Sequence, residues 1–171
     1  ISLYGASKLA SEALISAYSH NFGIKSWIFR FANVLGPRIT HGVVFDFYRK
    51  LKLNSSKLEV LGNGKQSKPY ILVDDLINGI FHAIKKSDNE MNYFNLGTEK
   101  KTNVKFIAEK VLEKLKLKKT KIIYGKSKRG WAGDVSHVQL NVNKIKQLGW
   151  KPKYINSNKA CEKGIEQIIS Y

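Results

Sequence analysis

The sequence is poor in cysteine and has no long apolar run, and both absences exclude classes of protein. Its single cysteine, Cys161, cannot form an internal disulfide, and low cysteine use is typical of a cytoplasmic protein. No apolar run approaches the length of a membrane span and no secretory signal is visible, so we expect no membrane partner. No histidine has a second ligand at metal spacing, so no metal site is expected. Cys161 lies in a helical pattern with no histidine nearby, which indicates a buried structural thiol rather than a nucleophile.

Acidic residues are also scarce. Only 13 Asp and Glu stand against 30 Lys and Arg, so the 171-residue chain has a net charge of +17. Only four of the basic residues are Arg, and the lysines are spread through the chain without a dense block that alternates with aromatics. Nucleic-acid binding favours a clustered basic patch. We therefore interpret the charge as a Lys-rich solvated surface, and nucleic acid is not the expected partner.

The start of the chain carries Tyr4 and Lys8 in the run Tyr4-Gly5-Ala6-Ser7-Lys8. Positions four apart lie on the same face of a helix, so both side chains can face one cleft. A phenol with an ordinary pKa of about 10 is a poor base at neutral pH, whereas a neighbouring ammonium stabilises the phenolate. Such a pair would suit a tyrosine that transfers protons. On the spacing alone, however, a surface helix with a chance Tyr and Lys is the favoured interpretation.

Alternating helix and strand patterns predict an α/β fold. The first helix is expected over residues 4–22, with an apolar stripe made of Leu9, Ala13, Leu14, Ala17 and Tyr18. A buried strand over residues 26–31 follows directly, which is typical of a parallel crossover unit. Further helices are expected at 43–53, 75–86, 103–117, 142–148 and 157–170. Further strands are expected at 58–61, 92–96 and 121–124.

Two local patterns make finer predictions. Gly62-Asn63-Gly64 indicates a hairpin turn. Asp74 and Asp75 end a strand, and an Asp of this pair is expected to cap the 75–86 helix. The residues of that helix expected to face inward are Ile77, Ile80, Phe81 and Ile84.

Several segments, in this order, resemble the extended short-chain dehydrogenase/reductase family. They are the Tyr-Gly-Ala-Ser-Lys helix, Arg30-Phe31-Ala32-Asn33-Val34-Leu35-Gly36-Pro37-Arg38, residues 62–76, Tyr93-Phe94-Asn95-Leu96-Gly97, and Leu148-Gly149-Trp150-Lys151-Pro152. The resemblance is greatest to the NAD-dependent nucleotide-sugar epimerases and dehydratases, of the UDP-glucose 4-epimerase type.

The resemblance implies a fold and a division of the chain. The fold would be the C-terminal part of a Rossmann-type parallel sheet with an interleaved small α/β substrate-binding domain. Residues 1–42 would end the NAD-binding domain, and residues 43–171 would be mainly the substrate-binding subdomain, with about 70–98 returning to the sheet. Family members are about twice as long and begin with a Gly-rich dinucleotide-binding turn, which this sequence lacks. We therefore expect the C-terminal half of a longer protein, inactive by itself and homodimeric in its full-length form.

The resemblance also implies an activity: NAD-dependent epimerisation at C4 of a nucleoside-diphosphate sugar, most readily a UDP-sugar, through a transient 4-keto intermediate. Tyr4 would take the proton from the sugar 4-hydroxyl. Lys8 would stabilise the phenolate and hold the nicotinamide ribose, so both residues would also bind the cofactor. Phe31 and Ala32 would line the nicotinamide side.

Three residues would bind the substrate diphosphate by this resemblance. They are Asn33, through its amide; Lys68, where family members usually carry Arg; and Arg129, whose fork matches phosphate oxygens. Lys68 keeps the charge of Arg but lacks the planar guanidinium. Asp134 is expected to hold its loop or to pair with Arg129. Trp131 would pack either on the base or sugar, or in the core.

Other functions stay open on the sequence alone. A nucleoside-diphosphate-sugar 4,6-dehydratase or reductase would share these segments. A basic nucleic-acid-binding module on the same fold is the alternative outside enzymes, because fold does not determine function.

Overall fold

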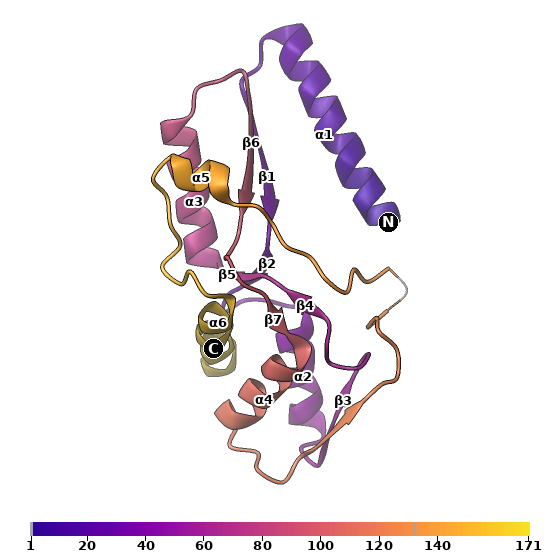
Figure 1. Ribbon diagram of the computed structural model, residues 1–171. Coiled ribbons are helices and arrows are strands. Elements are labelled where there is room, and N and C mark those ends of the chain that lie inside the picture. Colours follow the sequence, from indigo (N-terminus) through magenta and orange to yellow (C-terminus); the bar gives the residue numbers. More distant parts are fainter. Residues whose placement is uncertain (1, 132) are drawn as a thin grey trace.

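The computed structural model describes residues 2–131 and 133–171, which form the expected α/β fold (Figure 1). The helices are α1 (Leu3–Phe22), α2 (Val43–Leu53), α3 (Val73–Lys86), α4 (Val104–Lys114), α5 (Asn143–Gln147) and α6 (Ser157–Ser170). The strands are β1 (Ser26–Phe31), β2 (Asn33–Leu35), β3 (Lys57–Val60), β4 (Ser67–Lys68), β5 (Tyr70–Leu72), β6 (Met91–Leu96), β7 (Thr102–Asn103) and β8 (Lys121–Tyr124). Within this part of the chain, no helix combines the length and the apolar character that crossing a membrane requires.

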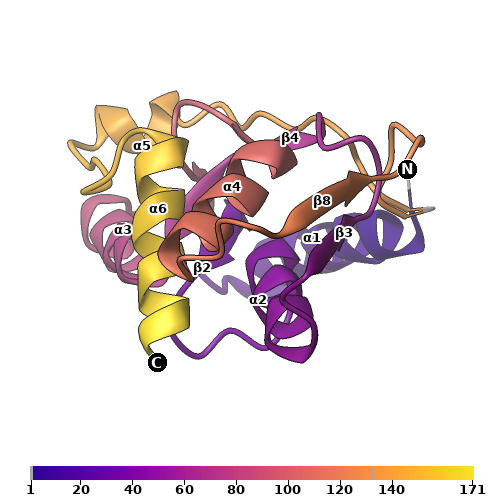
Figure 2. The ribbon, with the colours of Figure 1, turned by 90° about the horizontal axis from the view of Figure 1, so that it is seen from below.

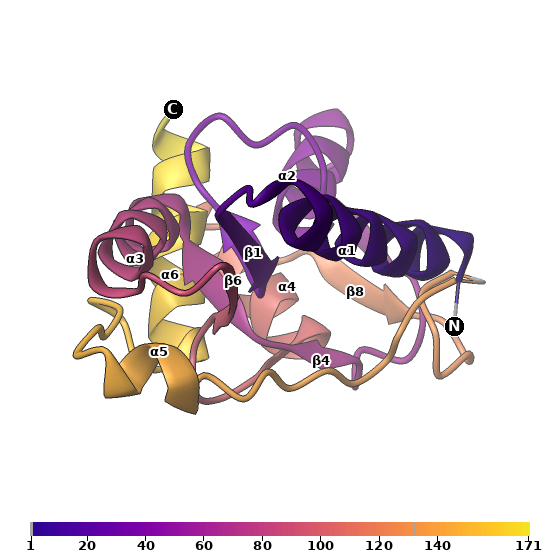
Figure 3. The same ribbon diagram turned by 90° about the horizontal axis from the view of Figure 1, so that it is seen from above.

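The strands pair in four two-stranded ladders. Among the described residues, the pairs β1–β6, β2–β5 and β3–β8 are parallel, and the pair β4–β7 is antiparallel. Helix α1 lies on one side of β1 and β6, and α3 lies on the other (Figure 3). Figure 2 shows β3 beside β8, next to α2, in a different part of the molecule. The parallel pairs confirm the predicted crossover topology.

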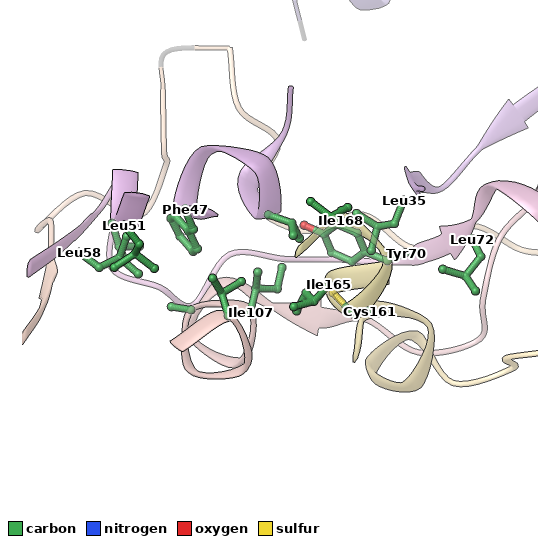
Figure 4. Close-up of a cluster of buried hydrophobic side chains, with 14 residues drawn as sticks. Leu35, Phe47, Leu51, Leu58, Tyr70, Leu72, Ile107, Cys161, Ile165 and Ile168 are labelled. Atoms are coloured by element: carbon green, nitrogen blue, oxygen red, sulfur yellow. The ribbon is translucent and has the colours of Figure 1, made fainter. Parts of the chain in front are cut away.

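Two clusters of buried side chains hold these parts together. The larger one joins α2, β3, α4 and α6, and includes Phe47, Leu58, Ile107 and Ile165 (Figure 4). Cys161 is fully buried in it, and burial raises the pKa of its thiol. The predicted structural cysteine is confirmed.

The second cluster lies between the strands, α3 and α5. Its residues are Ala32, Ile71, Leu76, Ala83, Phe94, Leu96, Val142, Ile145 and Trp150. The indole of Trp150 donates to Asn78 Oδ1 at 3.0 Å, so the segment after α5 is attached to α3. The division between the NAD-binding domain and the substrate-binding part at residues 42 and 43, with about 70–98 returning to the sheet, stays a proposal. The region around α5 also packs against the strands of this second cluster.

Helix α4 ends earlier than predicted, at Lys114 instead of about Leu117. The backbone of Lys116 is left-handed, with φ of 57°. The N–H of Leu117 donates to the carbonyl of Leu112, and that of Lys116 to the carbonyl of Glu113. These two bonds form a Schellman motif, which terminates a helix. At the other end of α4, the side chain of Asn103 caps the helix by accepting from the N–H of Phe106 at 2.7 Å.

The predicted hairpin turn at Gly62–Gly64 is wrong. The strand before it, β3, pairs with β8, and the strand after it, β4, pairs with β7. Both glycines have positive φ, as turn chemistry requires, and a Cβ on Gly62 would lie 2.0 Å from Nε2 of Gln66. The chain does turn at these glycines, but the strands on either side pair with strands distant in the sequence and not with each other.

The predicted inward face of α3 is wrong for three residues, which are exposed: Ile77, Phe81 and Ile84. The buried positions are Leu76, Gly79 and Ala83. A Cβ on Gly79 would lie 2.9 Å from Cζ2 of Trp150, so the helix uses its small residues to approach that indole closely. The buried face was set by a partner far along the chain.

The predicted Asp cap of α3 is also wrong, because its N-cap is Leu72 and no side chain caps it. Asp75 lies in the first turn instead, and its carboxylate accepts from the N–H groups of Lys153 at 2.9 Å and Tyr154 at 3.4 Å. Asp75 therefore has a structural role as predicted, but it stabilises a segment distant in the sequence and not the start of its own helix.

Helix α1 faces the sheet with polar residues. Glu12 and Ser16 are partly buried and Ser19 is fully buried, whereas the predicted apolar stripe, with Leu9 and Leu14, is exposed. The stripe exists but covers none of the described core. The physical reason is that polar contacts to β1 and β6, rather than apolar burial, hold this helix.

Candidate active site

Helix α1 presents Tyr4 and Lys8 together. The side chain of Ser2 caps the helix by accepting from the N–H of Gly5 at 3.0 Å. Tyr4 lies in the first turn and is 71% exposed, and Nζ of Lys8 lies 5.5 Å from the centre of its ring. The two side chains therefore share one face of the helix, as their spacing predicted.

Two contacts attach α1 to the strands. Nε of Arg30 on β1 donates to Oε1 of Glu12 at 2.8 Å, and a second bond joins the same two groups. The hydroxyls of Ser16 and Tyr93, on α1 and β6, lie 2.6 Å apart. The hydrogen bonds from Arg30 lower the pKa of Glu12, although partial burial opposes this. This two-pronged pair orients the helix that carries Tyr4.

Replacing Glu12 with Gln is expected to lower the free energy of unfolding at neutral pH but not in acid. The folded protein holds the pKa of Glu12 below its unfolded value of about 4.3, so the pair stabilises above that pH and loses its effect as the pH falls through the folded-state pKa. The Arg30 side chain is 52% exposed, so solvent screening limits the effect. We expect at most about 1 kcal/mol. Urea unfolding at about pH 7 and about pH 3 measures it, and an equal difference at both pH values would contradict it.

Two hollows meet beside this helix. The larger, a groove of about 1200 Å³, is lined by Tyr4, Lys8, Phe31, Ala32 and Asn33, among others. The smaller, a pocket of about 450 Å³, also has Asn33 in its wall. The N-terminal end of α1 and the loop after β8 lie on the same side of the molecule in all three views (Figures 1, 2 and 3). Of the predicted catalytic, cofactor and substrate residues, all except Arg129 thus line one or both of these hollows, which share Asn33.

Lys68 lines the smaller pocket, but it is already paired. Its Nζ lies 2.7 Å from Oδ1 of Asp134, whose side chain is 7% exposed. The other oxygen of Asp134 accepts from the N–H of Gly130 at 3.0 Å. Burial alone would raise the pKa of Asp134, but the bonds from Lys68 and Gly130 outweigh it and lower that pKa. Asp134 holds its loop as predicted, and its ion-pair partner is Lys68 rather than Arg129.

Arg129 does not lie among the residues that line either hollow, and it is exposed. Trp131, two residues later, does line the smaller pocket and is 63% exposed. The alternative of Trp131 as a core residue is therefore wrong. Diphosphate binding by Arg129 stays a prediction that needs its flexible side chain to reach toward the pocket.

Two residues of this site were not predicted from the sequence. Tyr70 is buried in the wall of the smaller pocket, and burial raises the pKa of its phenol, while the Asn33 side chain opposes the shift. Its position after Lys68 and Pro69, inside a recognised motif, was the available signal. His41 lines both hollows just before α2, and no sequence pattern marked it.

The groove fits one end of a dinucleotide cofactor. A phenol and an ammonium on one helix face can bind a ribose hydroxyl, and the half-exposed ring of Phe31 beside the small Ala32 offers a flat apolar wall. The sequence contains no Gly-rich turn for the pyrophosphate. Tyr4, Lys8, Phe31 and Ala32 would therefore hold the nicotinamide end. Among the described residues, no group of three or more metal-ligating side chains occurs.

The parallel strand pairs, with a Tyr–Lys helix beside them and a groove next to it, are typical of a Rossmann-like α/β protein. Residues 1–97 match the model of the NAD dependent epimerase/dehydratase family, and the chain belongs to this family. It is 29% identical to a putative UDP-glucose 4-epimerase of Methanocaldococcus jannaschii, with 100% of this chain and 53% of that protein covered.

Solved structures of UDP-hexose 4-epimerases are also similar to this chain. A crystal structure of UDP-galactose 4-epimerase has a TM-score of 0.86 at 35% identity, with 99% of this chain and 54% of that chain covered. UDP-glucose 4-epimerase from Thermotoga maritima, solved with UDP-glucose, has a TM-score of 0.81 at 30% identity, with 98% of this chain and 53% of that chain covered. The chain thus spans about half the length of the relatives that it matches.

Proposed function

We propose that the protein epimerises a nucleoside-diphosphate sugar at C4, of the UDP-glucose/UDP-galactose type, with NAD as a bound cofactor. The observation that carries this proposal is the Tyr4–Lys8 pair in a groove that joins, at Asn33, the pocket containing Lys68. The UDP-hexose 4-epimerases to which the chain is similar support the choice of reaction and of nucleotide.

Each residue then has a task. The chemistry that NAD would supply when bound is hydride transfer at C4 of the sugar. Tyr4, as its phenolate, takes the proton from the 4-hydroxyl and gives it back after the 4-keto sugar has turned over. The ammonium of Lys8, 5.5 Å from the centre of the Tyr4 ring, would place a positive charge beside that phenol and bind the nicotinamide ribose. Phe31 and Ala32 orient the nicotinamide.

The diphosphate is proposed to lie between the two hollows. Asn33 donates amide hydrogens without adding charge. Lys68 has three donors and uses one on Asp134, so it can bind a phosphate oxygen as well. Arg129 is proposed to approach from its exposed loop. Because Asp134 already neutralises part of the Lys68 charge, we expect a weaker clamp here than an unpaired cation would provide.

The test uses the full-length protein and NMR of the sugar products. Incubation with UDP-glucose and no added NAD is expected to yield the C4 epimer. A 4-keto-6-deoxy product from UDP-, dTDP- or GDP-sugars would make the protein a 4,6-dehydratase instead. Consumption of a reduced nicotinamide without epimer would indicate a reductase. No conversion, together with salt-sensitive binding to nucleic acid, would support a basic binding module.

The homodimer implied by the family resemblance also stays a prediction. Helix α1 supports it, because Leu9, Leu14 and Phe22 are exposed on this helix and contact with a second copy could bury apolar side chains of this kind. Sedimentation velocity of the full-length protein checks it, and a monomer at working concentration would contradict it.

A further inference from the structure

Trp131 differs from the other two tryptophans because its side chain is exposed and does not pack in the core. Trp150 is 3% exposed, and Trp27 is partly buried with its indole donating to Ser87 Oγ at 2.9 Å. Trp131 is 63% exposed and lies in the loop between β8 and α5. A large exposed aromatic side chain at a pocket is typical of a binding residue.

The loop holds the Trp131 ring in a defined place. A Cβ on Gly133 would lie 2.3 Å from Cζ3 of Trp131, so the ring rests directly on the Gly133 backbone. The N–H of Asp134 donates to the carbonyl of Trp131 at 3.1 Å, and the carboxylate of Asp134 is tied to Gly130 and Lys68. The indole is therefore presented by an anchored turn, which lowers the entropy that a ligand would have to overcome to order it.

The position of the ring indicates which part of a ligand it meets. Tyr4 and Lys8 line the larger groove and not the smaller pocket, whereas Trp131 lines only the smaller pocket. A sugar whose C4 lies at Tyr4 and whose diphosphate lies at Asn33 and Lys68 directs its nucleoside into the smaller pocket. The other walls there include Val43, Phe47 and Leu61, which suit a flat base.

We propose that Trp131 stacks on the nucleobase of the nucleotide sugar and supplies base affinity at this site. The inference rests on the function proposed above, because it needs the sugar at Tyr4. Stacking of a base on an aromatic side chain is tolerant of base identity. Trp131 is therefore a positive contact that strengthens binding, and the polar groups of the pocket select among bases.

Calorimetric titration of the full-length protein with UDP and with glucose 1-phosphate tests the proposal. Trp131→Ala is expected to weaken UDP binding about tenfold or more, with Trp131→Phe close to the wild type, because a smaller ring still stacks. Glucose 1-phosphate, which has the sugar and a phosphate but no base, should bind Trp131→Ala and the wild type equally. Gly133→Ala should weaken UDP binding too, because a Cβ displaces the ring while the indole is kept.

The control is Phe81→Ala, which removes another exposed ring, on α3, outside both hollows. It should leave both affinities unchanged. Unchanged UDP affinity in Trp131→Ala would overturn the proposal while epimerisation by the wild type leaves the proposed function standing. An equal loss for glucose 1-phosphate would overturn it in favour of a sugar contact. Failure of the wild type both to bind UDP and to convert UDP-sugars would overturn the proposed function and this inference together.

Discussion

Tyr4→Phe in the full-length protein is expected to reduce sugar epimerisation by about 10²- to 10⁴-fold, the contribution typical of a positioned acid–base group. The change removes one oxygen atom and keeps the ring beside Lys8, so the groove keeps its shape. NAD should stay bound, because the contacts of Lys8, Phe31 and Ala32 remain. NMR of the sugar products measures turnover, and the absorbance of the purified protein reports the bound cofactor.

The matched control is Tyr18→Phe, on the same helix and also exposed. Tyr18 lines neither hollow, and its ring lies tilted against that of Phe22, with ring centres 5.4 Å apart. Its variant should turn over like the wild type. Equal activity of Tyr4→Phe and Tyr18→Phe would remove Tyr4 from the mechanism and with it the basis for the proposed function.

Leu51→Ala is expected to lower the free energy of unfolding by about 2–5 kcal/mol. Leu51 is 3% exposed and packs in the cluster that joins α2 to β3 and α4. Truncation to Ala removes apolar contacts and leaves a cavity that a close-packed interior closes only in part. Urea unfolding followed by circular dichroism measures the loss.

Leu53→Ala is the control, because Leu53 lies on the same helix and is 82% exposed. The two variants make the same chemical change with nearly the same effect on helix propensity, so their difference reports burial. Leu53→Ala should change stability by no more than about 0.5 kcal/mol. Similar losses in the two variants would show that α2 packs differently from the arrangement described here.

The family segments, the α/β class and the positions of most helices and strands were readable from the sequence. The shared helix face of Tyr4 and Lys8 followed from spacing alone, because four residues make about one helical turn whatever surrounds the helix. The role of the pair rested on the family resemblance. The C-cap of α1 is Gly23 in a left-handed conformation, and the N-cap of α4 is Asn103; both follow capping chemistry, which is also local.

The strand partners and the buried faces were not readable in this way. The turn at Gly62 looked like a hairpin because its glycines need positive φ, yet β3 pairs with β8. The inward side of α3 is set by Trp150, which lies about 70 residues later in the sequence than Gly79. At both the Gly62–Gly64 turn and α3, the local residues are compatible with two arrangements. A segment distant in the sequence decides which strand pairs or which helix face is buried.

The same distinction applies to the site. The sequence by itself determined which residue types are available: a phenol and an ammonium on one helix, and an amide, a lysine and an arginine in recognisable segments. Only the tertiary structure decided that Lys68 pairs with Asp134, that Arg129 lies outside the pocket lining and that Trp131 lies within it. Chemical identity and local geometry are written in neighbouring residues, whereas charge pairing and exposure depend on which remote segments the fold brings together.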